Sequence, residues 1–117
     1  MNKFDLEERT MQFALKIVEF VATLPRDVVG NQIRFQLVKA GTSVGANYRE
    51  ANRAESRKDF IHKLAIVQKE LSESEYWLKL CHASNLGNPV KRRWLVQEAA
   101  ELLSIFTKSS KTAKART

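Results

Sequence analysis

The sequence predicts an all-α protein, an antiparallel up-down-up-down four-helix bundle. The chain has 117 residues, of which 44% are hydrophobic, so it can bury one core. Only four glycines and two prolines are present, which leaves few places for turns. In four stretches, apolar residues recur at alternating steps of four and three, the spacing of one helix face. We therefore expect one bundle domain in residues 1–106, followed by a basic tail in residues 107–117.

The first helix is expected from about Asp5 to Thr23. Its acidic first turn complements the positive end of the helix dipole. Pro25 ends the helix, because proline disfavours helical geometry in the residue before it. The buried face of this helix is predicted to consist of Leu6, Thr10, Phe13, Ile17, Phe20 and Leu24.

The second helix is expected from Asp27, a suitable N-cap, to about Arg53. Gly41 and Gly45 lie four residues apart within it and therefore share a face. Each costs about 1 kcal/mol of helix propensity relative to alanine. We interpret this face as a close contact between two helices of the same chain rather than as a ligand groove.

A polar seam follows the same four-three spacing beside the apolar seam of the second helix. Polar groups next to a core need hydrogen-bond partners, because leaving them buried and unpaired is costly. The acids of the third helix are the expected partners of this seam. The predicted structural polar network comprises Gln36, Ser43, Asn47, Glu50, Glu70 and Glu73.

The third helix is expected from Ser56, an N-cap with Asp59 three residues on, to about Ala83. Its apolar seam ends at Cys81, which we expect to be a packed thiol rather than a nucleophile. The seam comprises Phe60, Leu64, Val67, Leu71, Ser74, Leu78 and Cys81.

Glu70 and Glu73 lie a turn apart between apolar neighbours of the third helix. Paired acids can act as general acid and base or bind a metal ion. His62 and His82 are the only histidines, and neither has Glu-x-x-His spacing to these acids. We therefore favour pairing of the acids with Arg, Lys or the polar seam over catalysis, and expect no enzyme, metal or cofactor.

The fourth helix is expected to begin at Asn88 and Pro89, a good N-cap and first-turn pair. After Thr107 the sequence reads KSSKTAKART, which is basic and poor in apolar residues, so we expect it to be disordered. Such a tail either contacts nucleic acid or only increases solubility. The seam of the fourth helix comprises Leu95, Ala99, Leu102 and Phe106.

The net charge of +7 is concentrated in the second helix, the turn after it and the tail. This distribution favours phosphate-bearing partners, through electrostatic attraction and the release of counterions. Tyr48 is predicted to be an exposed aromatic that stacks on a base. The expected phosphate contacts are Arg49, Arg53, Arg57, Lys58, Lys91, Arg92 and Arg93.

Two alternatives apply to these basic residues. Glu50 and Glu55 could neutralise the arginines as ordinary pairs on a helix surface. The cluster at residues 91–93 opposes the dipole of the fourth helix, so it is either used for an anion contact or merely solvated.

Cysteine content and hydropathy limit the class of protein. The single Cys81 excludes an internal disulfide and a cysteine-based zinc site. No apolar run approaches the length of a transmembrane helix, and the first residues, MNKFDLEER, are charged rather than an apolar signal segment. We expect a cytoplasmic protein that does not enter a membrane.

The run GTSVGANYREANRAESRKDFIHKLAIVQKELSESEYWL resembles the small bacterial proteins known as 23S rRNA-intervening sequence proteins. These are named for members encoded within insertions in large-subunit ribosomal RNA genes. The resemblance extends from roughly Phe13 to Phe106. The matching positions are Gln36, Ala40, Ser43, Val44, Asn47, Glu50, Asp59, Phe60, Glu70, Glu73, Trp77 and Leu78.

The resemblance implies a four-helix bundle that assembles as a ring, most often a homopentamer. A related retroelement accessory protein has the same architecture and a basic surface that engages nucleic acid and a reverse transcriptase. Apolar residues in excess of one core, Trp77 and Trp94 among them, also favour self-association. The predicted function is a non-enzymatic homo-oligomeric bundle that binds nucleic acid, first of all RNA. The alternative is a ring-shaped scaffold whose partner is another protein, with no nucleic-acid role.

Overall fold

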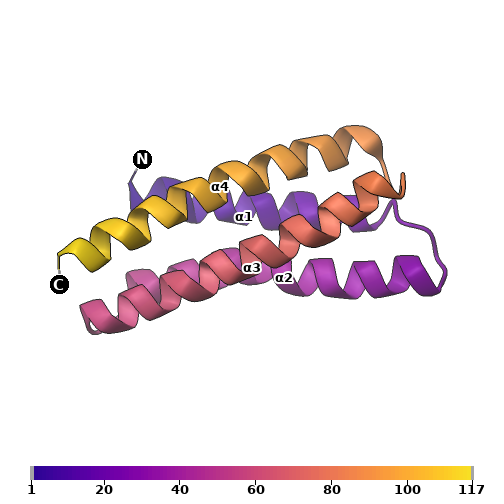
Figure 1. The fold of residues 1–117 in the computed structure, drawn as a ribbon. Helices are drawn as coiled ribbons and strands as arrows, with labels where there is room; N and C mark the ends of the chain where they lie inside the picture. The colour runs from indigo at the N-terminus through magenta and orange to yellow at the C-terminus, as the bar shows by residue number, and fades with distance from the viewer. Residues whose placement is uncertain (1, 117) are drawn as a thin grey trace.

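Residues 2–116 are described by the structure, a computed structural model, and they form four helices (Figure 1). Helices that follow one another in sequence pack side by side, and the chain runs alternately up and down an elongated bundle of 47 × 22 × 21 Å. The predicted all-α four-helix architecture is confirmed. The helices are α1 (Lys3–Val21), α2 (Val28–Asn52), α3 (Arg57–Ala83) and α4 (Pro89–Ala115).

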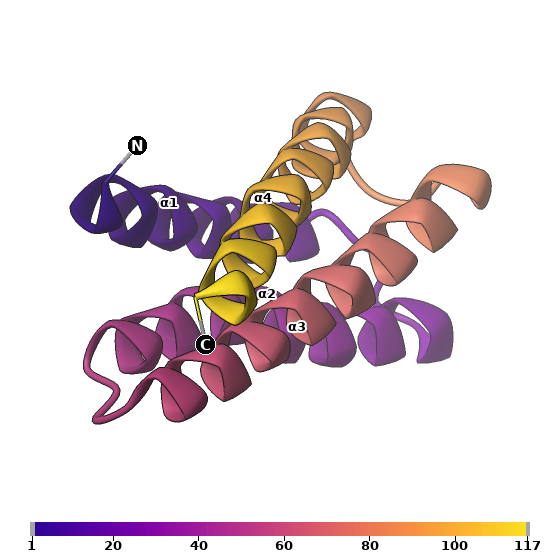
Figure 2. The ribbon, with the colours of Figure 1, turned by 60° about the vertical axis from the view of Figure 1, so that its left-hand side comes forward.

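The two ends of the bundle differ in what they contain. The terminal end holds the start of α1, the α2–α3 turn at residues 53–56 and the end of α4 (Figure 1). The distal end holds the connections at residues 22–27 and 84–88. Figure 2 shows α1 and α4 diverging toward the terminal end, and these two helices make the sparsest contact of the four neighbouring pairs. No helix in the described range is long and apolar enough to cross a membrane.

Each helix begins at a side chain that accepts a hydrogen bond from the backbone N–H three residues on. The predicted starts near Asp27, Ser56 and Asn88 are confirmed. α1 begins earlier than predicted, because Asn2 and Asp5 bond reciprocally, at 3.0 and 3.3 Å, in a capping box.

Apart from the half-buried Phe60, the predicted apolar seams form the core, and the first-helix seam from Leu6 to Leu24 is buried throughout. Cys81 is fully buried, and burial raises the pKa of its thiol to about 11, as expected for a packed thiol. Tyr48 is only 5% exposed and packs edge-on against Phe106, with ring centroids 5.0 Å apart. The prediction of Tyr48 as an exposed stacking aromatic was therefore wrong.

The contact between α1 and α2 depends on two glycines. A Cβ on Gly41 would lie 2.7 Å from Cγ1 of Ile17, and one on Gly45 would lie 3.1 Å from Oγ1 of Thr10. Both glycines are buried. The predicted close approach of two helices within the chain is confirmed.

α4 continues well beyond its large apolar residues and ends at Ala115. Ser110 and Ala113 are only 3% and 8% exposed. Ser110 lies four residues after Phe106 and Ala113 three residues after Ser110, so both continue the seam that includes Phe106. Small side chains occupy these buried positions, so the sequence shows little hydropathy there. The prediction of a disordered tail was wrong for residues 107–115, and residue 117 lies outside the described residues.

Arg92 holds the connection between α3 and α4. It is only 6% exposed, and its Nη1 donates to the carbonyl oxygens of Leu86, at 2.7 Å, and Gly87, at 3.4 Å. Gly87 has a φ of 79°, and a Cβ there would lie 2.6 Å from the ring of Phe20, so the turn requires glycine. Arg92 was predicted as a phosphate contact. This is corrected, because its guanidinium is buried and bonded to the loop.

A bidentate ion pair joins α1 to α4. Nε and Nη2 of Arg9 each lie 2.8 Å from a carboxylate oxygen of Glu98, and Nη2 lies 3.0 Å from Oε1 of Glu101. Glu98 is only 8% exposed, so its charge needs this partner. The hydrogen bonds to Glu98 raise the pKa of Arg9 above its ordinary value. The pair limits how far these two helices diverge.

Replacing Gly41 with alanine is expected to lower the free energy of unfolding by about 1 to 2 kcal/mol. The new methyl group would press on the fully buried Ile17, and this overpacking exceeds the gain in helix propensity. Urea denaturation followed by circular dichroism measures the change. Ser43→Ala on the same helix is the control and should cost nothing. A Gly41→Ala variant as stable as this control would contradict the close contact.

Arg92→Ala is expected to destabilise the protein by about 2 kcal/mol, because two loop carbonyls lose a charged donor. The neighbouring Arg93→Ala removes the same charge from an exposed side chain and should leave the melting temperature unchanged. Thermal denaturation of the two variants side by side measures the difference. Equal melting temperatures would show that Arg92 does not hold the loop.

Candidate nucleic-acid interface

A turn divides the predicted row of arginines. α2 ends at Asn52 and α3 begins at Arg57, so Arg53 is the C-cap of α2 and Arg57 opens the next helix. Arg49, Arg53 and Arg57 therefore do not share a single helix face. All three nevertheless lie at the terminal end of the bundle.

Arg49 is engaged with α1. Its Nη1 lies 3.4 Å from Oε1 of Glu7, and Oε2 of Glu7 accepts a hydrogen bond from Nδ2 of Asn52 at 2.9 Å. Glu7 thus joins α1 to the last turn of α2. Because its charge is already paired, Arg49 adds less free positive charge to the surface than its position in the sequence indicates.

Arg53, in the α2–α3 turn, and Lys58, just after it, are exposed cations, as is Arg57 between them. Nη1 of Arg53 donates to the carbonyl oxygen of Arg49 at 3.3 Å. Lys58 lies in the first turn of α3, where the helix dipole adds positive potential. Neither Arg53 nor Lys58 forms an ion pair within residues 2–116.

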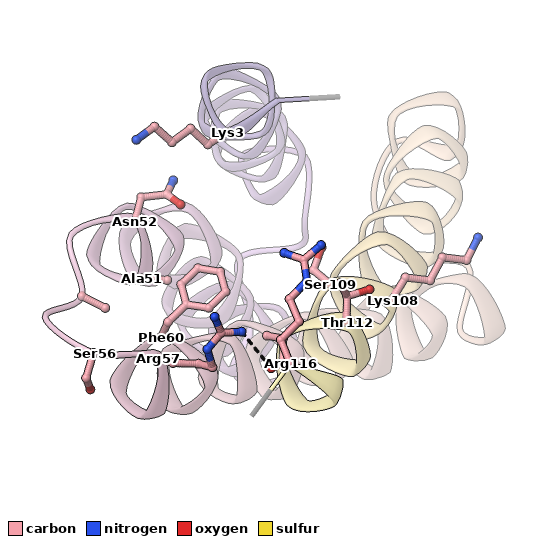
Figure 3. A pocket seen from close by; sticks show the side chains of 12 residues that line it. Lys3, Ala51, Asn52, Ser56, Arg57, Phe60, Lys108, Ser109, Thr112 and Arg116 are labelled. Atoms are coloured by element: carbon pink, nitrogen blue, oxygen red, sulfur yellow. Dashed lines mark hydrogen bonds between the residues drawn. The ribbon is translucent and has the colours of Figure 1, made fainter.

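A cavity of about 700 Å³ opens at the terminal end, between the α2–α3 turn, α1 and the end of α4 (Figure 3). We call it the terminal cavity. Its basic lining residues come from segments far apart in the sequence: Lys3, Arg57, Lys108 and Arg116. Nη1 of Arg57 also donates to the carbonyl oxygen of Ala113 at 3.4 Å, which ties α3 to α4. Among the described residues, no Asp or Glu lines this cavity.

The remaining lining of the terminal cavity combines hydroxyl groups with an aromatic ring. Ser109 and Thr112 lie on α4, and Ser56 lies at the start of α3. The half-buried ring of Phe60 also lines the cavity, packed against the core (Figure 3). Phosphate oxygens accept hydrogen bonds from such hydroxyls and guanidinium groups, and an aromatic ring can stack on a base.

The second predicted basic cluster lies elsewhere. Lys91 and Arg93 are exposed in the first turn of α4, at the distal end of the bundle, and Arg92 between them is buried. The 47 Å length of the molecule runs between the two ends. The structure therefore does not bring residues 91–93 together with the arginines of the α2–α3 turn.

Two residues of the polar seam of α2 find their partners within their own helix. Oγ of Ser43 donates to the carbonyl oxygen of Lys39 at 2.6 Å, and Nδ2 of Asn47 donates to that of Ser43 at 2.8 Å. Such bonds to the preceding turn are common for these residue types. In the described part of the chain, no hydrogen bond joins the seam to the acids of α3. The expected network is therefore not formed by Gln36, Ser43, Asn47, Glu50, Glu70 and Glu73.

The acidic members of that seam have separate environments. Glu50 is exposed and pairs with Lys63 of α3 at 3.0 Å. Glu70 and Glu73 are half-buried, and burial, followed by repulsion from Glu73, raises the pKa of Glu70. Across residues 2–116, no three His, Cys, Asp or Glu side chains are grouped closely enough to hold a metal ion.

Three basic residues of the terminal cavity were not predicted individually from the sequence: Lys3, Lys108 and Arg116. These residues could have been predicted from helical periodicity, although hydropathy does not indicate them. Ser110 and Ala113 continue the four-three spacing of the α4 seam, which extends the helix and carries its basic end to the cavity.

Comparison with known proteins agrees with this fold. Residues 2–108 match the family model of the 23S rRNA-intervening sequence protein. A crystal structure of a protein of unknown function from the S23 ribosomal protein family of Bacteroides thetaiotaomicron VPI-5482 is similar, with a TM-score of 0.81 and 31% sequence identity. The alignment covers 95% of this chain and 99% of that chain. No curated protein matches the sequence. Because the family match spans nearly the whole chain, the protein belongs to the 23S rRNA-intervening sequence protein family.

Proposed function

We propose that the protein is a non-enzymatic, homo-oligomeric bundle that binds nucleic acid, with RNA as the polymer. The observation that carries this proposal is the gathering of basic side chains at the terminal end, around a cavity whose described lining contains no acid. The family name refers to ribosomal RNA, which makes RNA the first polymer to test. The proposed contacts are Arg53, Arg57, Lys58, Lys108 and Arg116.

The positive charge of this surface should make its affinity for RNA depend on salt concentration. A strand that contacts several cations releases the counterions condensed on its phosphates, so its affinity falls steeply with salt concentration. The basic groups are carried by α3, α4 and the turn before α3, which belong to one packed bundle. Binding therefore requires little reordering of the protein backbone.

Self-association is proposed through the outer face of α1. Large apolar side chains recur there at helical spacing, and each is between 43% and 69% exposed. Soluble monomers rarely expose several large apolar side chains on one helix face. That five copies assemble into a homopentamer remains a prediction. The apolar stripe on this face comprises Phe4, Met11, Leu15 and Val18.

The same stripe favours a second candidate function, a scaffold whose partner is another protein. An apolar helix face can dock a partner helix as readily as a second copy of the chain. This candidate differs from the first in requiring no nucleic acid.

RNA binding at the terminal end is tested with two matched double variants. Arg53→Gln with Lys58→Gln removes two charges at the terminal end, and Lys91→Gln with Arg93→Gln removes two at the distal end. Fluorescence anisotropy with a labelled single-stranded RNA gives affinity as a function of salt. We expect only the terminal-end variant to bind markedly more weakly, with the slope of log K against log salt reduced by about 1 to 2.

Equal losses in the two variants would mean that net charge, rather than a site, holds the RNA. A larger loss of affinity in the distal-end variant would place the interface at the distal end of the bundle, at the start of α4. Absence of RNA and DNA binding by the unmodified protein at low salt would overturn the nucleic-acid proposal and leave the scaffold.

The proposed association through α1 is tested with Leu15→Glu combined with Val18→Glu. Two charges in the stripe should dissociate the assembly, because they would be buried without partners. Light scattering coupled to gel filtration measures mass, and the unmodified protein should exceed the 13.4 kDa of one chain several-fold. Gln12→Glu with Lys16→Glu, on the same helix but outside the stripe, is the control. An assembly that survives the stripe variant would exclude this face.

A further inference from the structure

The terminal cavity is an open, basic depression that combines four cationic side chains with hydroxyl groups and an aromatic ring. Its volume of about 700 Å³ is in the range of small-molecule sites. Lys3, Arg57, Lys108 and Arg116 line it, and the described lining residues include no carboxylate. A phosphodiester in the middle of a strand carries a single charge and continues on both sides, so it is a poor match for a concavity with this much positive charge.

A phosphate monoester suits the cavity better. It carries between one and two negative charges near neutral pH and presents three terminal oxygens. Arg57 offers a planar set of donors, and its hydrogen bond to the carbonyl oxygen of Ala113 holds it at the end of α4. The hydroxyls of Ser109 and Thr112 come from the same helix as Lys108, whose side chain extends outward from the rim of the cavity (Figure 3).

The aromatic ring in the cavity indicates what the phosphate is attached to. Phe60 lines the cavity beside Ala51 and Arg57 and is packed against the core, which fixes its position (Figure 3). A ring held in this way can stack on a nucleobase. Cations and an aromatic ring in one cavity are the groups that bind a nucleotide.

We propose that the terminal cavity binds a terminal nucleotide that carries a phosphate monoester. The nucleotide is either the phosphorylated end of an RNA strand or a free mononucleotide. For a strand end, this inference rests on the proposed function, because the rest of the strand must lie on the basic surface around the cavity.

The test compares RNA strands that differ only at one end. A single-stranded RNA with a 5′-phosphate, one with a 3′-phosphate and one with hydroxyls at both ends compete for the full-length protein against a labelled strand. We expect one phosphorylated strand to bind about tenfold more tightly than the hydroxyl strand, as for one added charge-assisted contact. AMP should compete better than inorganic phosphate, because Phe60 contacts the base.

Two lysines on α4 provide the matched variants. Lys108 lines the cavity, whereas Lys111 is exposed one turn away and does not. Lys108→Gln combined with Arg116→Gln should abolish the preference for the phosphorylated end, and Lys111→Gln should keep it. Circular dichroism checks that each variant is folded.

The outcomes separate this inference from the proposed function. If RNA binds with the expected salt dependence but phosphorylated and hydroxyl strands bind equally, the cavity inference is overturned and the proposed function stands. If no RNA binds but AMP does, and the Lys108→Gln and Arg116→Gln double variant loses AMP binding, the ligand is a free mononucleotide and the proposed function fails. If neither RNA nor AMP binds, both fail. A preference for the phosphorylated end that Lys111→Gln removes as fully as the cavity variant would also overturn the inference.

Discussion

The close approach of α1 to α2 at Gly41 and Gly45 is the constraint on which the rest of the bundle depends. Because these residues have no side chains, α1 lies directly on the surface of α2. This contact brings Glu7 to the last turn of α2 and Arg9 to Glu98 of α4, two of the polar contacts of α1. A larger side chain at either glycine would push α1 outward and weaken both. An apolar contact within the bundle therefore sets the geometry of the terminal end, where the candidate site lies.

Most of the fold could be predicted because its determinants are local. The starts near Asp27, Ser56 and Asn88 follow from a side chain that bonds to the backbone three residues on, and the buried seams follow from helical spacing alone. The prediction failed at the end of α4, where Ser110 and Ala113 are buried although they are small. Composition indicates disorder there, whereas the spacing indicates helix. Packing against the neighbouring helices makes this segment helical, as the spacing indicates.

The candidate site could be predicted only in part, because it depends on where distant segments meet. Arg92 and Arg93 are identical neighbours in sequence, yet one is buried in a loop and the other is exposed. The difference comes from the carbonyl groups of Leu86 and Gly87, whose directions no local pattern specifies. Likewise, Lys108 lines the same cavity as the start of α3 only because the last helix extends to the same end of the bundle as the α2–α3 turn (Figure 1).

The charge distribution explains why the terminal cavity is a candidate site for an anion. Several cations elsewhere pair with acids across helices, as in Arg9–Glu98, Arg49–Glu7 and Lys63–Glu50. Basic side chains from three segments line the cavity without a carboxylate among the described lining residues, and like charges placed near one another oppose folding. The chain has acidic residues nearby that could have balanced them, Glu55 and Asp59 in sequence among them. An anion in the cavity would supply the missing counter-charge and stabilise the folded state in proportion to its occupancy. Both the stability of the folded state and the affinity of this end of the bundle for an anion therefore depend on the same unbalanced charge.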